Sequence, residues 1–175
     1  DQRAETFLNS REAARSFRWL RPGTTVQART TEDGSLLSLW FIAGRDQLIS
    51  IDRSGESFAF TEQPADLARE VHMKSGEIKS SLFAATDSAG LPDGVATQIA
   101  DIFAGDIDFH RDLRRGDKFT VVYELFHHLG RPVKYGRVLA AEFSNQKKSY
   151  RAVWFQESDA RGGYYAPDGK NLRKA

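Results

Sequence analysis

Histidine is the side chain most often used for metal binding and for proton transfer near neutral pH, and this sequence contains four, at His72, His110, His127 and His128. A hydrolytic zinc site needs about three protein ligands and one open position for water. Neighbouring residues of a strand point to opposite faces, so the adjacent His127 and His128 cannot easily chelate one ion. We therefore expect no metal site here, and a hairpin end with one of these rings exposed and one half-buried.

A second group of candidate residues is basic. It consists of Arg111, Arg114, Arg115 and Lys118, with Asp112 and Asp117 among them. One interpretation is a contact to an anionic ligand or to an acidic domain of the same protein. The other, which the spacing favours, is a solvated turn with local Arg–Asp pairs, each worth about 0–1 kcal/mol. The nearby Asp106 and Asp108 follow a helix stop, and turn formation explains them without acid–base catalysis.

Aromatic residues supply a third candidate. Tyr164 and Tyr165 follow Gly162-Gly163 and could form a stacking surface for a sugar or peptide, or a contact between domains. The alternative is one tyrosine in the core and one with its hydroxyl at the surface. The three tryptophans, Trp19, Trp40 and Trp154, stand in apolar periodic contexts and are expected to be core residues.

Composition limits the class of protein. Hydrophobic content of 40% and charged content of 28% in 175 residues are typical of one ordinary or two small soluble domains. The absence of cysteine excludes disulfides and thiolate chemistry. No apolar run reaches the roughly 18–20 residues of a membrane helix. The first ten residues are too polar for a signal peptide, so we expect an exported form to have lost its signal beforehand.

Charge is distributed unevenly along the chain. Residues 1–110 carry a net charge of −6 and residues 111–175 carry +7. A basic half could face an anionic polymer, or the acidic half of the same chain. No recognised nucleic-acid motif accompanies it, so we do not expect nucleic-acid binding. The signatures of phosphate-binding, dinucleotide-binding and serine-hydrolase sites are also absent, which argues against an independent enzyme.

The elements that would position these residues follow from periodicity. A helix is predicted over residues 5–20, then strands over residues 25–30, Leu36–Ala43, 47–52 and 57–61, with turns at Asp33-Gly34 and Ser54-Gly55. A boundary is predicted at Gln63-Pro64. Further on, a strand over residues 67–74 should end in a turn at Ser75-Gly76, before a helix over Leu82–Ser88.

A second helix should open at Pro92 and Asp93, because proline suits the first turn and a carboxylate suits the positive end of the dipole. Its apolar stripe is Val95, Ile99, Ile102 and Phe103. Strands are predicted over residues 119–127, 134–144, 150–156 and 162–166. The fold class is therefore α+β, with two small domains, 1–64 and 65–175, made mainly of antiparallel sheet with a few short helices.

An ordered series of segments resembles the non-catalytic N-terminal domains of lysostaphin-type (LytM-like) zinc murein endopeptidases. The segments are SLFAATDSAGLPDGVATQIADIF at residues 81–103, the RRGDKF turn at 114–119 and GGYYAPDGKNLRKA at 162–175. In that family zinc is held by a His-x-x-x-Asp and a His-x-His motif of the catalytic domain. Neither pattern occurs around the four histidines here. The resemblance therefore implies a part without catalytic or metal-binding residues, with zinc expected in a catalytic domain absent from this chain.

The resemblance also implies a role and a location. By this resemblance we expect the chain to regulate access to the catalytic groove or to position the enzyme on peptidoglycan, in the periplasm of the bacterial envelope. The expected partners are the protein's own catalytic domain and peptidoglycan. The Glu32-Asp33 turn is a candidate to plug the groove, and Arg111, Arg114, Arg115, Lys118, Tyr164 and Tyr165 are candidates for ligand or interdomain contacts. The alternative is a stand-alone wall-binding or adaptor module that acts through its basic face.

Overall fold

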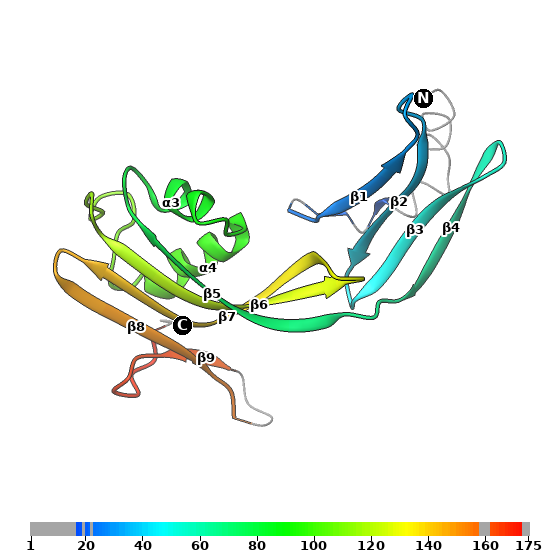
Figure 1. Ribbon diagram of the computed structural model, residues 1–175. Coiled ribbons are helices and arrows are strands. Elements are labelled where there is room, and N and C mark those ends of the chain that lie inside the picture. The colour runs from blue at the N-terminus through cyan, green and yellow to red at the C-terminus, as the bar shows by residue number, and fades with distance from the viewer. Residues whose placement is uncertain (1–16, 19, 22, 158–161, 173–175) are drawn as a thin grey trace. The chain divides into compact units, whose positions relative to one another are not determined.

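The computed structural model describes residues 17–18, 20–21, 23–157 and 162–172, which belong to two compact units (Figure 1). The first unit is Asp1–Ala68 with Phe126–Lys134, and the second is Arg69–Leu125 with Tyr135–Ala175. Two antiparallel sheets and two short helices confirm the predicted α+β class. Most of the helix predicted over residues 5–20 lies outside the described residues. Among the residues described, none of the helices has the length and apolar character needed to cross a membrane.

The sheet of the first unit is a four-stranded meander. Its strands are β1 (Val26–Thr30), β2 (Leu36–Ala43), β3 (Gln47–Ser54) and β4 (Ser57–Pro64), hydrogen-bonded in chain order. The predicted turns at Asp33-Gly34 and Ser54-Gly55 join the first two strands and the last two. Both glycines have positive φ, 83° and 62°, a conformation that glycine adopts without a steric penalty.

Strand β2 explains the apolar run LLSLWFIA, because both of its faces are covered. On one face Phe41 packs with Ile49 of β3 and with Phe17. On the other face Ile42 packs with Leu48 and with Val133 of strand β7 (Arg131–Asn145). A strand buried on both faces has no polar alternation, and this is the pattern that the sequence shows.

The second sheet has five strands in chain order. They are β5 (Ala68–Glu77), β6 (Lys118–His128), β7 (Arg131–Asn145), β8 (Lys148–Phe155) and β9 (Gly163–Tyr165). Asn145 pairs with Lys148 across a two-residue turn, where Gln146 and Lys147 have φ of 51° and 68°. Positive φ at both central residues is characteristic of the type I′ hairpin turn.

Two helices cover one face of this sheet (Figure 1). Helix α3 (Leu82–Ser88) begins at Ser81, whose hydroxyl accepts the backbone N–H of Ala84. Helix α4 (Asp93–Phe103) begins after Pro92, as predicted. Its predicted stripe is fully buried, together with inward-facing residues of β6. The members of this core include Val95, Ile99, Ile102, Phe103, Phe119, Val121 and Tyr123.

The turn predicted at Ser75-Gly76 is wrong, because β5 continues through both residues to Glu77. Glycine is needed there for close packing and not for a turn. A Cβ atom on Gly76 would lie 2.5 Å from the Phe119 ring, so the aromatic side chain occupies the space above the strand. Ser75 is also held in the sheet, since its hydroxyl lies 2.9 Å from the hydroxyl of Thr120 on β6.

Two phenylalanines of the helical layer test the assignment of the core. Phe103 is fully buried and Phe83 is 49% exposed. We expect Phe103→Ala to lower the free energy of unfolding by about 3–5 kcal/mol, because it removes buried surface and leaves a cavity. Phe83→Ala should stay within about 0.5 kcal/mol of the parent. Urea unfolding followed by circular dichroism measures both, and equal effects would contradict the proposed core.

Candidate functional site

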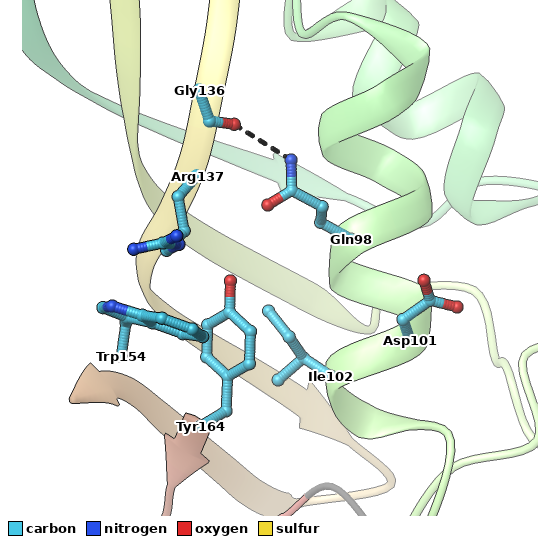
Figure 2. Close-up of a pocket in the computed structure, with 7 residues that line it drawn as sticks. All are labelled: Gln98, Asp101, Ile102, Gly136, Arg137, Trp154 and Tyr164. Atoms are coloured by element: carbon cyan, nitrogen blue, oxygen red, sulfur yellow. Dashed lines mark hydrogen bonds between the residues drawn. The ribbon is translucent and has the colours of Figure 1, made fainter. Parts of the chain in front are cut away.

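A cavity of about 320 Å³ lies between helix α4 and strands β7, β8 and β9 of the second unit (Figure 2). Its lining consists of Gln98, Asp101, Ile102, Gly136, Arg137, Trp154 and Tyr164. The volume is at the lower end of the range of about 300–1,000 Å³ that is typical of small-molecule sites. The cavity joins apolar and charged side chains, so it can hold a small polar ligand.

The wall formed by β7 is held by side chains. Gln98 of α4 donates its Nε2 to the carbonyl of Gly136 at 3.0 Å and accepts the backbone N–H of Val138 on its Oε1 at 2.9 Å (Figure 2). The Tyr164 hydroxyl donates to the carbonyl of Val138 at 2.9 Å. These bonds satisfy backbone groups that would be costly to leave unpaired. The polar groups of Gln98 and Tyr164 are therefore occupied by bonds to the β7 backbone.

The burial pattern shows why this part of β7 needs such support. Val138 and Ala141 are both buried although they lie three residues apart. Residues of a regular strand that share a face are an even number of positions apart, so the alternation shifts between Val138 and Ala141. Arg137 lies beside this shift and contributes to the lining of the cavity.

An arginine–tryptophan pair forms the second wall. The Arg137 guanidinium lies 3.8 Å from the centroid of the Trp154 ring, and Trp154 packs edge-on against Tyr164 at 5.1 Å (Figure 2). A Cβ atom on Gly162 would lie 2.1 Å from Trp154, so glycine lets the chain pass close to the indole. Arginine that stacks through its flat face keeps its N–H donors free at the edge.

Glu124 of β6 fixes the backbone of Arg137 from the other side. Its Oε2 accepts the Arg137 backbone N–H at 3.0 Å, and its Oε1 lies 2.7 Å from Nε of Arg69. Burial acts to raise the pKa of Glu124, but the hydrogen bonds from Arg137 and Arg69 outweigh burial and lower the pKa below its ordinary value. The carboxylate is therefore a structural anion.

A second, broader cavity of about 530 Å³ lies along β8 and the segment after β9. Lys148 lies 4.6 Å from the centroid of the Tyr150 ring, and Arg151 pairs with Glu142 at 3.3 Å. The hydrogen bond from Ser149 is the main reason that the pKa of Glu142 is lowered. Lys148 and Lys170 line this cavity together with Asp106 and Asp168, so it carries charges of both signs.

The predicted basic cluster surrounds a structural carboxylate. Asp117 is buried and accepts hydrogen bonds from the backbone N–H of Arg114 at 2.7 Å, from Asn145 Nδ2 at 2.7 Å and from the backbone N–H of Gln146 at 3.1 Å. It thus joins the turn before β6 to the turn between β7 and β8.

The four basic side chains of the cluster differ in whether neighbouring groups bind them. The Arg114 guanidinium folds back and donates to the carbonyls of Arg111 and Leu113, each at 2.8 Å. Arg111 lies 3.8 Å from the Asp108 carboxylate, as expected of a turn. Arg115 and Lys118 are exposed on the outer surface of the turn. A ligand or interdomain contact by these four residues stays a prediction.

The two residues of the proposed plug have different surroundings. Asp33 accepts hydrogen bonds from the Thr31 hydroxyl and from Ser35, and the bond from Thr31 is the main reason that the pKa of Asp33 is lowered. Glu32 is exposed at the tip of the turn. Asp33 therefore shapes the turn, and Glu32 is its available carboxylate.

The tyrosine pair divides between two environments. Tyr164 is buried and faces the core, whereas Tyr165 is half-buried on the other face of β9, where it packs edge-on against Phe155 at 6.2 Å. Trp154 and Trp40 are half-buried and not fully internal. Trp19 lies outside the described residues.

Sequence reasoning missed the residues that form the first cavity, namely Gln98, Asp101, Arg137 and the exposed part of Trp154. It also missed that His72 Nε2 lies 2.9 Å from Glu70 Oε2. A histidine two residues after a glutamate matches neither of the family's zinc motifs. His127 and His128 are both half-buried, so the prediction of one exposed ring is wrong. His128 is tied by its Nδ1 to the carbonyl of Asp66 at 2.9 Å and by its ring to Trp40.

Comparison with known proteins confirms the resemblance seen in the sequence. No family model matches the chain. The peptidoglycan DD-endopeptidase ShyC of Vibrio cholerae is 26% identical over 156 residues, which are 89% of this chain and 35% of ShyC. ShyA of the same organism, also a peptidoglycan DD-endopeptidase, is 27% identical over 157 residues, 89% of this chain and 36% of ShyA. The chain thus spans about a third of the length of these relatives.

A solved structure shares the fold. A zinc-containing peptidase from Vibrio cholerae superimposes with a TM-score of 0.58 and 22% identity, over 89% of this chain and 47% of that chain. At this level of identity the similarity is one of fold. The relation to a part of the peptidoglycan endopeptidases comes from the sequence relatives.

Gln98 tests how the cavity wall is held. We expect Gln98→Leu to lower the free energy of unfolding by about 1–3 kcal/mol, because it leaves the Gly136 carbonyl and the Val138 N–H without their partner. Thr97→Ala on the exposed side of α4 is the control and should change it by about 0.5 kcal/mol or less. Urea unfolding provides the measurement. Equal effects of the two substitutions would mean that the glutamine does not hold the wall.

Glu124 should make stability depend on pH. Its folded-state pKa lies below the ordinary value of 4.5, so its contribution is complete above pH 4.5 and is lost as the pH falls through the folded-state pKa. We expect Glu124→Gln to be less stable than the parent at pH 7 and to lose less stability on acidification. Urea midpoints between pH 7 and pH 3 measure this. Parallel curves for the two proteins would refute the assignment.

Proposed function

We propose that this chain, a relative of a part of the peptidoglycan DD-endopeptidases, is the non-catalytic region of a zinc metalloendopeptidase of the bacterial envelope. In this proposal it acts in the periplasm, where it positions the peptidase domain on peptidoglycan and limits access to its zinc. The relation to ShyC over 156 residues is the observation that carries the proposal. The two-sheet fold shared with a zinc-containing peptidase supports it.

The assignment of catalysis to another domain rests on the histidines. The four histidines occur in neither of the two zinc-binding patterns of the family. One of them, His128, is also bound through its ring to the Asp66 carbonyl. We therefore assign the hydrolytic zinc to the peptidase domain, and the residues of this chain supply binding and positioning.

Positioning on peptidoglycan would use exposed cations of the second unit. Arg115 and Lys118 stand on the turn before β6, and Lys148 and Lys170 on the rim of the broader cavity. Peptidoglycan carries carboxylates on its peptides, so exposed cations would attract it at low ionic strength. This attraction is screened over about 10 Å at 0.1 M salt. Binding would therefore weaken as salt rises.

Limiting access would use the turn between β1 and β2. Glu32 is exposed at its tip, and Asp33 holds the turn rigid through Thr31 and Ser35. A carboxylate is a ligand for zinc and a mimic of the substrate's own carbonyl oxygen. A rigid turn that presents one carboxylate is thus a suitable plug for a groove with an open metal position.

The test adds the 175-residue chain to the isolated zinc peptidase domain from its own source and measures release of peptides from purified peptidoglycan. We expect several-fold slower release with the parent chain. Glu32→Gln should relieve this inhibition, and Glu62→Gln, an exposed carboxylate on β4, should not.

Co-sedimentation with purified sacculi separates the two roles. Sedimentation that falls with rising salt, without any effect on peptide release, would favour a stand-alone wall-binding module and contradict the access-limiting role. Neither binding nor inhibition at high chain concentration would refute the proposed function as a whole.

A further inference from the structure

We propose that the cavity between α4, β7, β8 and β9 binds a compact zwitterion, an amino acid or short peptide with a free ammonium and a free carboxylate. Arg137 would hold the carboxylate and Asp101 the ammonium. The inference depends on the proposed function only for the source of the ligand, which would be short peptides released from peptidoglycan by hydrolysis. Binding itself is argued from the cavity.

The two charges stand on different elements that line one space. Arg137 belongs to β7 and Asp101 to α4, and both contribute to the lining of the cavity (Figure 2). In the part of the chain that the structure describes, neither side chain forms a salt bridge. Glu124, the acidic residue whose pKa the charge of Arg137 affects, is bound to Arg69. The cavity thus offers one cation and one anion, neither of which forms a salt bridge within the described residues.

The state of Arg137 favours a carboxylate. Its flat face is 3.8 Å from the centroid of Trp154, and this contact fixes the plane of the guanidinium. The N–H donors lie in that plane, at the edge of the guanidinium, in the fork that matches the two oxygens of a carboxylate. Because the contact with Trp154 fixes the guanidinium in advance, binding a carboxylate costs less side-chain entropy.

The rest of the lining argues against a sugar. Sugar sites use an open aromatic face, whereas Trp154 is covered by Arg137, approached by Gly162 and packed against the Tyr164 ring. The Tyr164 hydroxyl and both ends of the Gln98 amide are bonded to the β7 backbone. The groups left for a ligand are therefore the two charges and an apolar surface that includes Ile102. A volume of about 320 Å³ suits a ligand of amino-acid to dipeptide size.

The test titrates the 175-residue chain with D-alanyl-D-alanine and follows the Trp154 indole N–H and the Gln98 side-chain amide by NMR. Two single-charge probes, the N-acetylated dipeptide and the dipeptide C-terminal amide, should each bind about tenfold or more weakly, because each loses one charge-assisted contact. Arg137→Gln and Asp101→Asn should weaken binding of the parent dipeptide by a similar factor.

Matched controls are exposed charges outside the cavity. Lys79→Gln, just before α3, and Asp87→Asn on α3 should leave the affinity unchanged. Circular dichroism shows whether each variant is folded, and Asp101→Asn, a conservative change at an exposed side chain, remains informative if Arg137→Gln is unstable. Equal affinity for all three probes, or no shift of either reporter resonance, would overturn the inference.

Co-sedimentation with sacculi distinguishes the two proposals. Competition by the dipeptide in the parent chain, lost in Arg137→Gln, would support peptidoglycan peptides as the source of the ligand. Sacculus binding without dipeptide binding would overturn this inference and leave the proposed function intact. Dipeptide binding without any effect on peptide release or sacculus binding would support the cavity and count against the proposed function.

Discussion

Backbone polar groups that leave the hydrogen-bond ladder of a sheet must find other partners, and residues 136–138 of β7 meet this requirement through side chains. Gln98 bonds Gly136 and Val138, Tyr164 bonds Val138, and Glu124 bonds the backbone of Arg137. These partners come from α4, β9 and β6. The same bonds therefore fix the helix against the sheet and direct Arg137 toward the cavity.

The sequence predicted most elements of the fold because their signals are local. The stripe Val95, Ile99 and Ile102 defined α4, and the apolar run in β2 defined a strand buried on two faces. The turn at Ser75-Gly76 was predicted wrongly because a glycine that makes room for Phe119 looks the same in sequence as a glycine in a turn.

The cavity could not be found in this way. Its walls come from residues 98–102, 136–137, 154 and 164, and only the packed sheet brings them together. The basic turn shows the reverse case. Its residue types were noticed in the sequence, but the buried role of Asp117 depends on Asn145 and Gln146, which lie 28 and 29 positions away. Local patterns could suggest a turn there and could not show which acid was structural.

The bonds of Asp117 have a further consequence for how the second unit opens. One carboxylate holds the amide of Arg114 in one turn and the amide of Gln146 in another, so neither turn can fray while the other keeps its full set of bonds. Local opening of this end of the sheet is therefore cooperative, and amide protons in the two turns should exchange with solvent as one group. Because Asp117 links the two turns, exposed side chains on them, such as Arg115, are held at fixed distances from one another.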